Sequence, residues 1–169
     1  LVAAARGAPL DTDALYARHV AVLEAGEDGV EQEVRGLLDE VGALLEATRV
    51  LGYTSPRAND RIIAAGEKLS VRLLAAVLRR QGAQAVCVDA DRFLDTDDHF
   101  GEANPLPAVT GRGIDARLRP LLEAGNIVVV TGFCGRAPNG ATTTLGRGGS
   151  DYSATLVAAG LRAERVIIW

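Results

Sequence analysis

Residues 118–132, LRPLLEAGNIVVVTG, decide the fold, because a glycine joins a helical pattern to a run of β-branched residues. The same order occurs at 73–90, LLAAVLRRQGAQAVCVDA, and at 154–169, ATLVAAGLRAERVIIW. Strands that are apolar without alternation are buried on both faces, and the helices between them supply the crossovers that parallel pairing requires. The sequence therefore predicts an α/β fold with a mainly parallel sheet.

Such a sheet indicates where a ligand binds, because ligands collect beyond the carboxyl ends of parallel strands. The loops after Val88, Val130 and Trp169 are therefore the places to search. Before the repeated units, a helix is predicted at about 12–25, because Asp11, Thr12 or Asp13 can cap its start and Gly26 lies where it would end. Apolar spacing predicts a second helix at 29–47. We expect each helix of the repeated units to end at its glycine.

Composition narrows the classes of protein. The 169 residues are 48% hydrophobic and carry a net charge of −4, which argues against a protein that neutralises nucleic-acid phosphates. No apolar run approaches the roughly 20 residues that span a bilayer, and we expect a cytoplasmic protein without a membrane partner. Cys87 and Cys134 are far apart and indicate neither a zinc site nor a disulfide. Methionine is absent and Lys68 is the one lysine, which suggests a piece of a longer protein.

The glycine-rich stretch 142–160, TTTLGRGGSDYSATLVAAG, opens directly into a helical pattern. Glycine backbones approach ligands closely, and a helix N-terminus attracts anions, so one interpretation is an anion site. Arg147 among the glycines favours it, because a guanidinium binds a carboxylate or phosphate through two hydrogen bonds. The alternative is that Ser150 or Asp151 only caps the helix. The spacing matches neither the P-loop nor the dinucleotide-binding glycine motif.

The string TTLGRGGSDYSA at 143–154 closely resembles the signature block of aspartokinases, members of the amino-acid kinase superfamily. Three more blocks resemble the family in its own order: SPRANDRIIAAGEKLSVRLLAAVL at 55–78, VDADRFLDTDDHFGEA at 88–103 and TGFCGRAPNG at 131–140. The resemblance implies a three-layer αβα sandwich, the amino-acid kinase fold, incomplete at both ends. Residues 1–169 would be a partial catalytic domain, with 1–50 a helical insert and 51–169 the core αβ units.

The function that the resemblance implies is phosphoryl transfer from ATP to the β-carboxylate of L-aspartate. By that resemblance Arg147 would pair with the substrate α-carboxylate and Glu67 would accept its ammonium group. Ser150 would contact the reacting carboxylate, and Asp151 would be the catalytic residue of the transfer centre. Gly148, Gly149 and Phe133 complete the expected substrate site, and the expected nucleotide site contains Gly132, Gly135 and Gly146.

The acidic residues elsewhere are expected to bind no metal. Asp95, Asp97 and Asp98 predict a solvated turn, and His99 a loop residue. Mg²⁺ would be held through the nucleotide phosphates instead.

The chain also departs from the family. Aspartokinases begin with a KFGG-type motif whose lysine bridges the ATP phosphates, and no such motif occurs here. Lys68 follows Gly66-Glu67 on a helix and does not replace that lysine, so we expect no kinase activity from these residues alone. Two alternatives remain: another amino-acid kinase, acting on glutamate or carbamate, or a binding or assembly module on the same fold. A homo-oligomer is expected.

Overall fold

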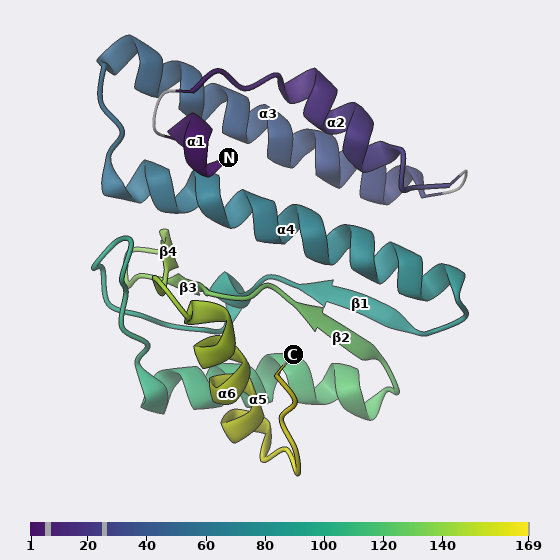
Figure 1. Ribbon diagram of the computed structural model, residues 1–169. Coiled ribbons are helices and arrows are strands. Elements are labelled where there is room, and N and C mark those ends of the chain that lie inside the picture. The colour runs from purple at the N-terminus through teal and green to yellow at the C-terminus, as the bar shows by residue number, and fades with distance from the viewer. Residues whose placement is uncertain (6–7, 25–26, 169) are drawn as a thin grey trace.

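The computed structural model describes residues 1–5, 8–24 and 27–168, and its centre is the long helix α4 (Figure 1). The helices are α1 (Val2–Ala5), α2 (Thr12–Val20), α3 (Asp28–Leu51), α4 (Pro56–Arg80), α5 (Pro107–Glu123) and α6 (Gly149–Leu161), with a 3₁₀ turn at Ala90–Arg92. The strands are β1 (Ala85–Val88), β2 (Ile127–Val130), β3 (Cys134–Arg136) and β4 (Thr142–Thr144). None of the described helices has the length and apolar character needed to cross a bilayer.

Helix α4 begins where the sequence places a turn. The Ser55 hydroxyl accepts a hydrogen bond from the Ala58 N–H at 3.2 Å, and Pro56 occupies the first turn, where its missing N–H costs nothing. One face of α4 packs on α3 through Leu69 and Ile62, and the other face lies over the sheet. Helix α4 therefore joins the N-terminal helices to the αβ part of the chain.

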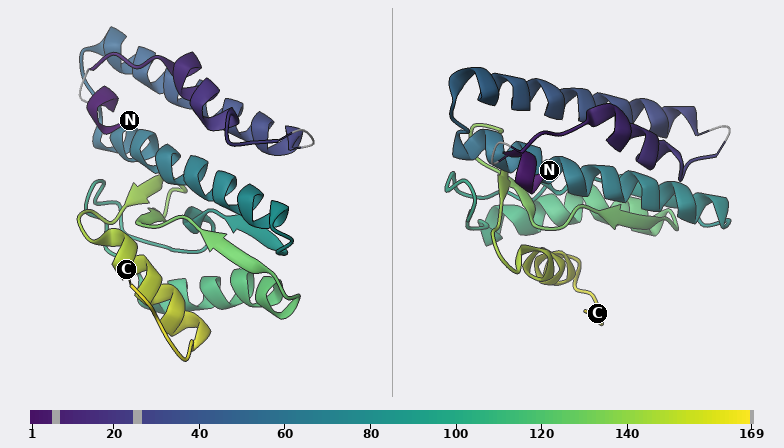
Figure 2. Two further views of the ribbon diagram at one scale, coloured as in Figure 1. Left: turned by 45° about the vertical axis from the view of Figure 1, so that its right-hand side comes forward. Right: turned by 45° about the horizontal axis from the view of Figure 1, so that its top comes forward.

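The sheet confirms the α/β prediction. Strands β1 and β2 are parallel, with Ala85 opposite Ile127 and Val88 opposite Val130, and α5 is the crossover between them. Helix α4 covers one face of the sheet, while α5 and α6 lie on the other (Figures 1 and 2). The largest core cluster, between these layers, includes Phe93, Leu94, Ile114, Leu118 and Cys134. A short antiparallel pair, β3 and β4, follows β2.

The predicted third strand, at the end of 154–169, is wrong for its described residues. Positions 163–168 form no strand, and Val166, Ile167 and Ile168 are exposed. A strand needs a neighbour for its N–H and C=O groups, and no described strand lies beside this segment to pair with it. Trp169 lies outside the described residues.

Two predicted helix ends are also wrong. Gly160 lies inside α6, which ends at Leu161. A Cβ on Gly160 would come within 2.9 Å of Ile114, so glycine permits α6 to pack on α5. Helix α2 ends at Val20 rather than near residue 25, and the Val22 carbonyl accepts a hydrogen bond from Arg80, which ties this segment to the end of α4. Gly26, the expected terminator, lies outside the described residues.

The acidic loop after β1 is more ordered than predicted. Asp95 pairs with Arg136 at 2.6 Å, and Asp97 accepts hydrogen bonds from the backbone and side-chain amides of Asn104 at 2.9 and 2.8 Å. The prediction of a solvated turn is therefore wrong for these two residues, because both carboxylates fold the loop onto its neighbours. Asp98 and His99 are exposed, as expected of loop residues.

Asp97 provides a prediction about stability in acid. The Asn104 amides hold the pKa of Asp97 well below its usual range. A carboxylate whose pKa is lower in the folded state stabilises the fold above its unfolded pKa and loses that contribution as the pH falls. We expect Asp97→Asn to flatten the decline of urea stability below about pH 4. Asp98→Asn, which removes a neighbouring exposed charge, should keep the parent's decline; an equally steep decline in Asp97→Asn would contradict the prediction.

Candidate active site

Phe133, just beyond β2, has a strained backbone. Its φ of 41° lies in the left-handed region, which costs a non-glycine residue on the order of 1–3 kcal/mol. Two hydrogen bonds hold it there: the Phe133 N–H donates to the Ser153 hydroxyl at 3.2 Å, and the Leu145 N–H donates to the Phe133 carbonyl at 2.9 Å. The chain therefore turns sharply at the carboxyl end of the sheet, where ligands of such folds bind.

A cleft of about 270 Å³ lies at this turn and at the start of α6. Gly146 and Gly148 both have positive φ, and Gly148 precedes the helix, so the chain enters α6 without a side-chain cap. The capping interpretation of Ser150 and Asp151 is therefore wrong. The cleft is lined by Phe133, Gly146, Gly148, Gly149, Ser150 and Asp151. The first N–H groups of α6 face no intrahelical acceptor, which makes this end of the helix favourable for an anion.

Three charged side chains near the strand ends are free. Within the described residues, the side chains of Glu67, Arg147 and Asp151 form neither a hydrogen bond nor an ion pair. Arg147 and Asp151 are exposed on either side of the glycine turn, and Glu67 is half-buried on α4. Charges without internal partners remain available to a ligand.

Glu67 is electrostatically coupled to the same end of the sheet. Cys134 directly follows Phe133, and burial strongly raises the pKa of the Cys134 thiol. The charges of Asp91 and Glu67 raise this pKa further. Lys68, the next residue along α4, contacts Asp91 just beyond the end of β1, so this part of the helix lies at the carboxyl ends of the strands. Helix α4 therefore carries an acidic group to the side of the strand ends opposite α6. The buried thiol has no chemistry of its own here.

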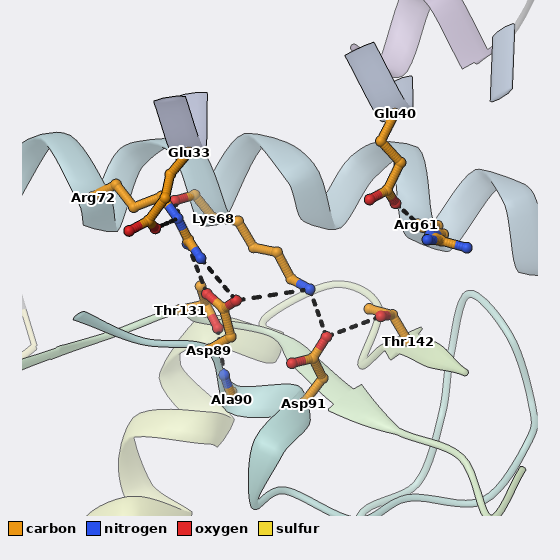
Figure 3. Close-up of polar contacts among 10 residues, drawn as sticks. All are labelled: Glu33, Glu40, Arg61, Lys68, Arg72, Asp89, Ala90, Asp91, Thr131 and Thr142. Atoms are coloured by element: carbon orange, nitrogen blue, oxygen red, sulfur yellow. Dashed lines mark hydrogen bonds and ion pairs between the residues drawn. The ribbon is translucent and has the colours of Figure 1, made fainter. Parts of the chain in front are cut away.

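Lys68, beside Glu67, is fully engaged (Figure 3). Its ammonium lies 2.6 Å from an Asp91 oxygen and 3.9 Å from Asp89, and these side chains are 18%, 11% and 12% exposed. Thr142 donates to the same Asp91 oxygen at 2.9 Å, and Arg72 holds Asp89 through two hydrogen bonds. Because its charge is neutralised at the end of β1, Lys68 does not extend toward the cleft. This network anchors α4 to the sheet.

Two of the predicted glycines lie away from the cleft lining. A Cβ on Gly135 would lie 2.5 Å from Thr96, so this buried glycine permits close packing of β3, and it is not among the residues that line the cleft. Gly132 is not a lining residue either, although a Cβ on it would come within 2.8 Å of the hydroxyl of Ser150, which does line the cleft. Of the three glycines expected in the nucleotide site, Gly146 alone lines the cleft. No cluster of His, Cys, Asp or Glu that could hold a metal occurs in the described part of the chain.

Two residues that shape the site were not singled out from the sequence. Ser153 holds Phe133, and the buried Asp60 binds Thr144, two residues before Gly146. The signal for Asp60 is its spacing. With Ala64 at i+4 and Glu67 at i+7, Asp60 lies on the face of α4 that meets the sheet. A hydroxyl such as Ser153 has no comparable signal, because serine is common throughout helices and loops.

Comparison with known proteins shows the family to which this fold and site belong. Residues 7–169 match the model of the amino acid kinase family, and the chain belongs to that family. It is 39% identical to lysine-sensitive aspartokinase 3 of Escherichia coli over 83% of the chain and 30% of that protein, and 39% identical to the aspartokinase of Schizosaccharomyces pombe over 77% and 25%. The chain thus spans less than a third of the length of these relatives.

Solved structures agree with the sequence comparison. Escherichia coli aspartokinase III, solved with aspartate and ADP, superposes with a TM-score of 0.90 and 36% identity over 99% of this chain and 38% of that one. Clostridium acetobutylicum aspartate kinase superposes over 95% of this chain and 32% of that one with a TM-score of 0.67 at 22% identity, which shows the fold alone.

The tight contact at the cleft leads to a second prediction. A Cβ on Gly149 would lie 2.7 Å from the Phe133 Cβ and 2.9 Å from the Leu145 Cβ. We expect Gly149→Ala to lower the free energy of unfolding, measured with urea, by roughly 1–3 kcal/mol. The matched control is Gly36→Ala in α3, where nothing lies within 4 Å and alanine should stabilise by about 0.5–1 kcal/mol. Equal effects of the two substitutions would show that Gly149 is not under steric constraint.

Proposed function

We propose that the full-length protein carrying this chain is an aspartate kinase, which transfers the γ-phosphoryl group of ATP to the β-carboxylate of L-aspartate. The observation that carries the proposal is a set of charged side chains without partners among the described residues: Asp151, which lines the cleft, Arg147 in the glycine turn beside it, and Glu67 on α4. Arg147 can bind a carboxylate and Glu67 an ammonium group, which are the two charged groups on the α-carbon of an amino acid. Relatives named aspartokinases, one of them solved with aspartate and ADP, support the same substrates.

Each free charge has a proposed role. Arg147 binds the substrate α-carboxylate, because a guanidinium holds both oxygens and fixes their orientation. Glu67 accepts the substrate ammonium from the opposite side. The N–H groups at the start of α6, with Ser150, hydrogen-bond the reacting carboxylate, and Asp151 orders the groups around the phosphoryl transfer. Holding both reactants in line lowers the activation barrier of such reactions by roughly 7–11 kcal/mol.

The nucleotide and its metal are proposed as partners of the same cleft. Gly146 and the positive end of α6 fit a phosphate group, because both present backbone N–H groups without side-chain obstruction. The described residues offer no protein cluster for a metal, so we propose that Mg²⁺ is held through the nucleotide phosphates and neutralises their charge. Gly132 and Gly135 support the walls of the cleft by packing and have no proposed nucleotide contact.

A kinase for glutamate or carbamate is the nearest alternative. Carbamate has no ammonium group and would leave Glu67 without a partner, and glutamate adds one methylene between the α-carbon, which Glu67 and Arg147 hold, and the reacting carboxylate. A panel of L-aspartate, L-glutamate and carbamate, assayed by ADP release from the full-length protein, separates the three. A binding module without catalysis would release no ADP with any of them.

Arg147 provides the direct test of the amino-acid site. We expect Arg147→Ala in the full-length protein to lower kcat/KM for L-aspartate by about 100-fold or more, because the α-carboxylate loses its charged partner. The matched control is Arg112→Ala, which removes an exposed arginine from α5 and should leave turnover unchanged. Aspartate-dependent turnover that survives Arg147→Ala would place the working site elsewhere.

For the 169 residues alone, we propose that no turnover occurs. The charge of Lys68 is committed to Asp91 and Asp89, so this lysine is not available to bridge ATP phosphates. We expect the purified chain to release no ADP above background when L-aspartate is added, in a coupled assay that detects the full-length protein. ADP release that depends on L-aspartate would contradict this prediction.

The remaining features are proposed on narrower grounds. We propose that residues 1–50 are a helical insert before the core units at 51–169. Exposed apolar side chains at the end of α3, Val50 and Leu51, and on α4, Leu74, support a homo-oligomer. Use of ATP as the phosphoryl donor supports a cytoplasmic location.

A further inference from the structure

Asp60 is a fully buried carboxylate on the sheet-facing side of α4, with 0% of its surface exposed. Its Oδ2 accepts hydrogen bonds from the N–H groups of Gly101 and Thr144, both at 2.9 Å. Its Oδ1 accepts one from the Thr144 hydroxyl, also at 2.9 Å. No cation pairs with Asp60 among the described residues, so these three donors alone compensate its burial. One side chain thus holds two separate segments of the chain.

These two segments support the glycine turn at the cleft. The Ala103 N–H donates to the Thr144 carbonyl at 2.9 Å, and a Cβ on Gly146 would lie 3.2 Å from the Gly101 carbonyl oxygen. Thr144 therefore lies against the loop that carries Gly101, and Gly146 follows directly in the same contact. Arg147 comes next in the chain. The position of this turn depends on the place where Asp60 anchors Thr144.

The same helix carries Glu67. Asp60 and Glu67 are seven residues apart, so they lie on one side of α4 about two turns, roughly 10 Å, apart along its axis. The Lys68–Asp91 pair fixes the Glu67 end of this segment to the sheet. Asp60 fixes its other end to the turn before Arg147. The helix thereby becomes a rigid link between the two groups proposed to bind the substrate's ammonium and α-carboxylate.

We propose that Asp60 is a positioning residue, whose carboxylate sets the separation between Glu67 and Arg147 and so the affinity of the site for an α-amino acid. The inference rests on the proposed function for its substrate. The anchoring of the turn by Asp60 does not depend on the proposed function, because the three hydrogen bonds of Asp60 exist without a ligand.

The chemistry of the donors predicts which substitutions keep this role. Burial raises the pKa of Asp60, while its hydrogen bonds to Gly101 and Thr144 oppose that rise. Asparagine can keep all three bonds: its oxygen accepts from both N–H groups, and its amide donates to the Thr144 hydroxyl, which then acts as acceptor. Alanine keeps none and leaves two buried N–H groups without a partner.

The first experiment needs no substrate. Amide hydrogen exchange by NMR on the 169-residue chain compares Asp60→Ala, Asp60→Asn and Ile62→Ala. Ile62 is as buried as Asp60 but packs with Val41 toward α3, so its substitution destabilises α4 without touching the turn. Relative to Val129 in the sheet, we expect Asp60→Ala to accelerate exchange at Thr144 at least tenfold and to shift the amide signals of the glycine turn. Asp60→Asn and Ile62→Ala should do neither.

The second experiment measures KM and kcat for L-aspartate in the full-length protein. We expect Asp60→Ala to raise KM at least tenfold with kcat changed less than threefold, and Asp60→Asn to restore KM. An unshifted turn in Asp60→Ala, an equal shift in Ile62→Ala, or an unchanged KM despite a shifted turn would each overturn the proposal. A wild-type protein that does not use L-aspartate would refute the proposed function, while the amide exchange would still decide whether Asp60 holds the turn.

Discussion

Helix α4 buries charged groups against the carboxyl end of the sheet, and the rest of the site depends on how those charges are satisfied. An unpaired buried charge costs several kcal/mol, so each one must find partners across elements. Lys68 finds Asp91, Arg72 finds Asp89, and Asp60 finds the backbone of β4 and of the loop that carries Gly101. These contacts connect α4 to β1, β4 and the loop after β1. Glu67, on the same helix, has no side-chain partner among the residues that the structure describes.

The cleft itself combines strain with small residues. Phe133 holds a left-handed backbone, and Gly149 lies so close to it that no side chain fits. Neither arrangement is favourable alone, and each persists because Ser153 and Leu145 hold Phe133 in place. The result is a rigid turn at a helix N-terminus with no side chain across its backbone. Such a turn suits an anionic ligand better than a capped helix start does.

Local pattern predicted the elements well where burial and periodicity agreed. The runs at β1 and β2 were recognisable because they are continuously apolar, and α3 was recognisable because its apolar residues form one stripe. The predictions are wrong where contacts with residues far away in the sequence determine the local structure. The apolar run before Trp169 is no strand among the described residues because nothing described pairs with it, and Gly160 lies inside α6 at a place where Ile114 leaves no room for a side chain. Asp95 and Asp97 are ordered by Arg136 and Asn104, which the local sequence does not place beside them.

The sequence by itself determined the α/β class, the order of α4, β1, α5, β2 and α6, and the placement of Arg147, Ser150 and Asp151 together at a glycine-rich helix start. These follow from spacing along the chain, since a run of glycines before a helix is local chemistry. Only the tertiary structure decided that Gly135 packs internally, that Lys68 is neutralised, and that Asp60 anchors the turn. Each of those facts is a contact between segments many residues apart. Whether a side chain is free or engaged depends on what the fold brings to it.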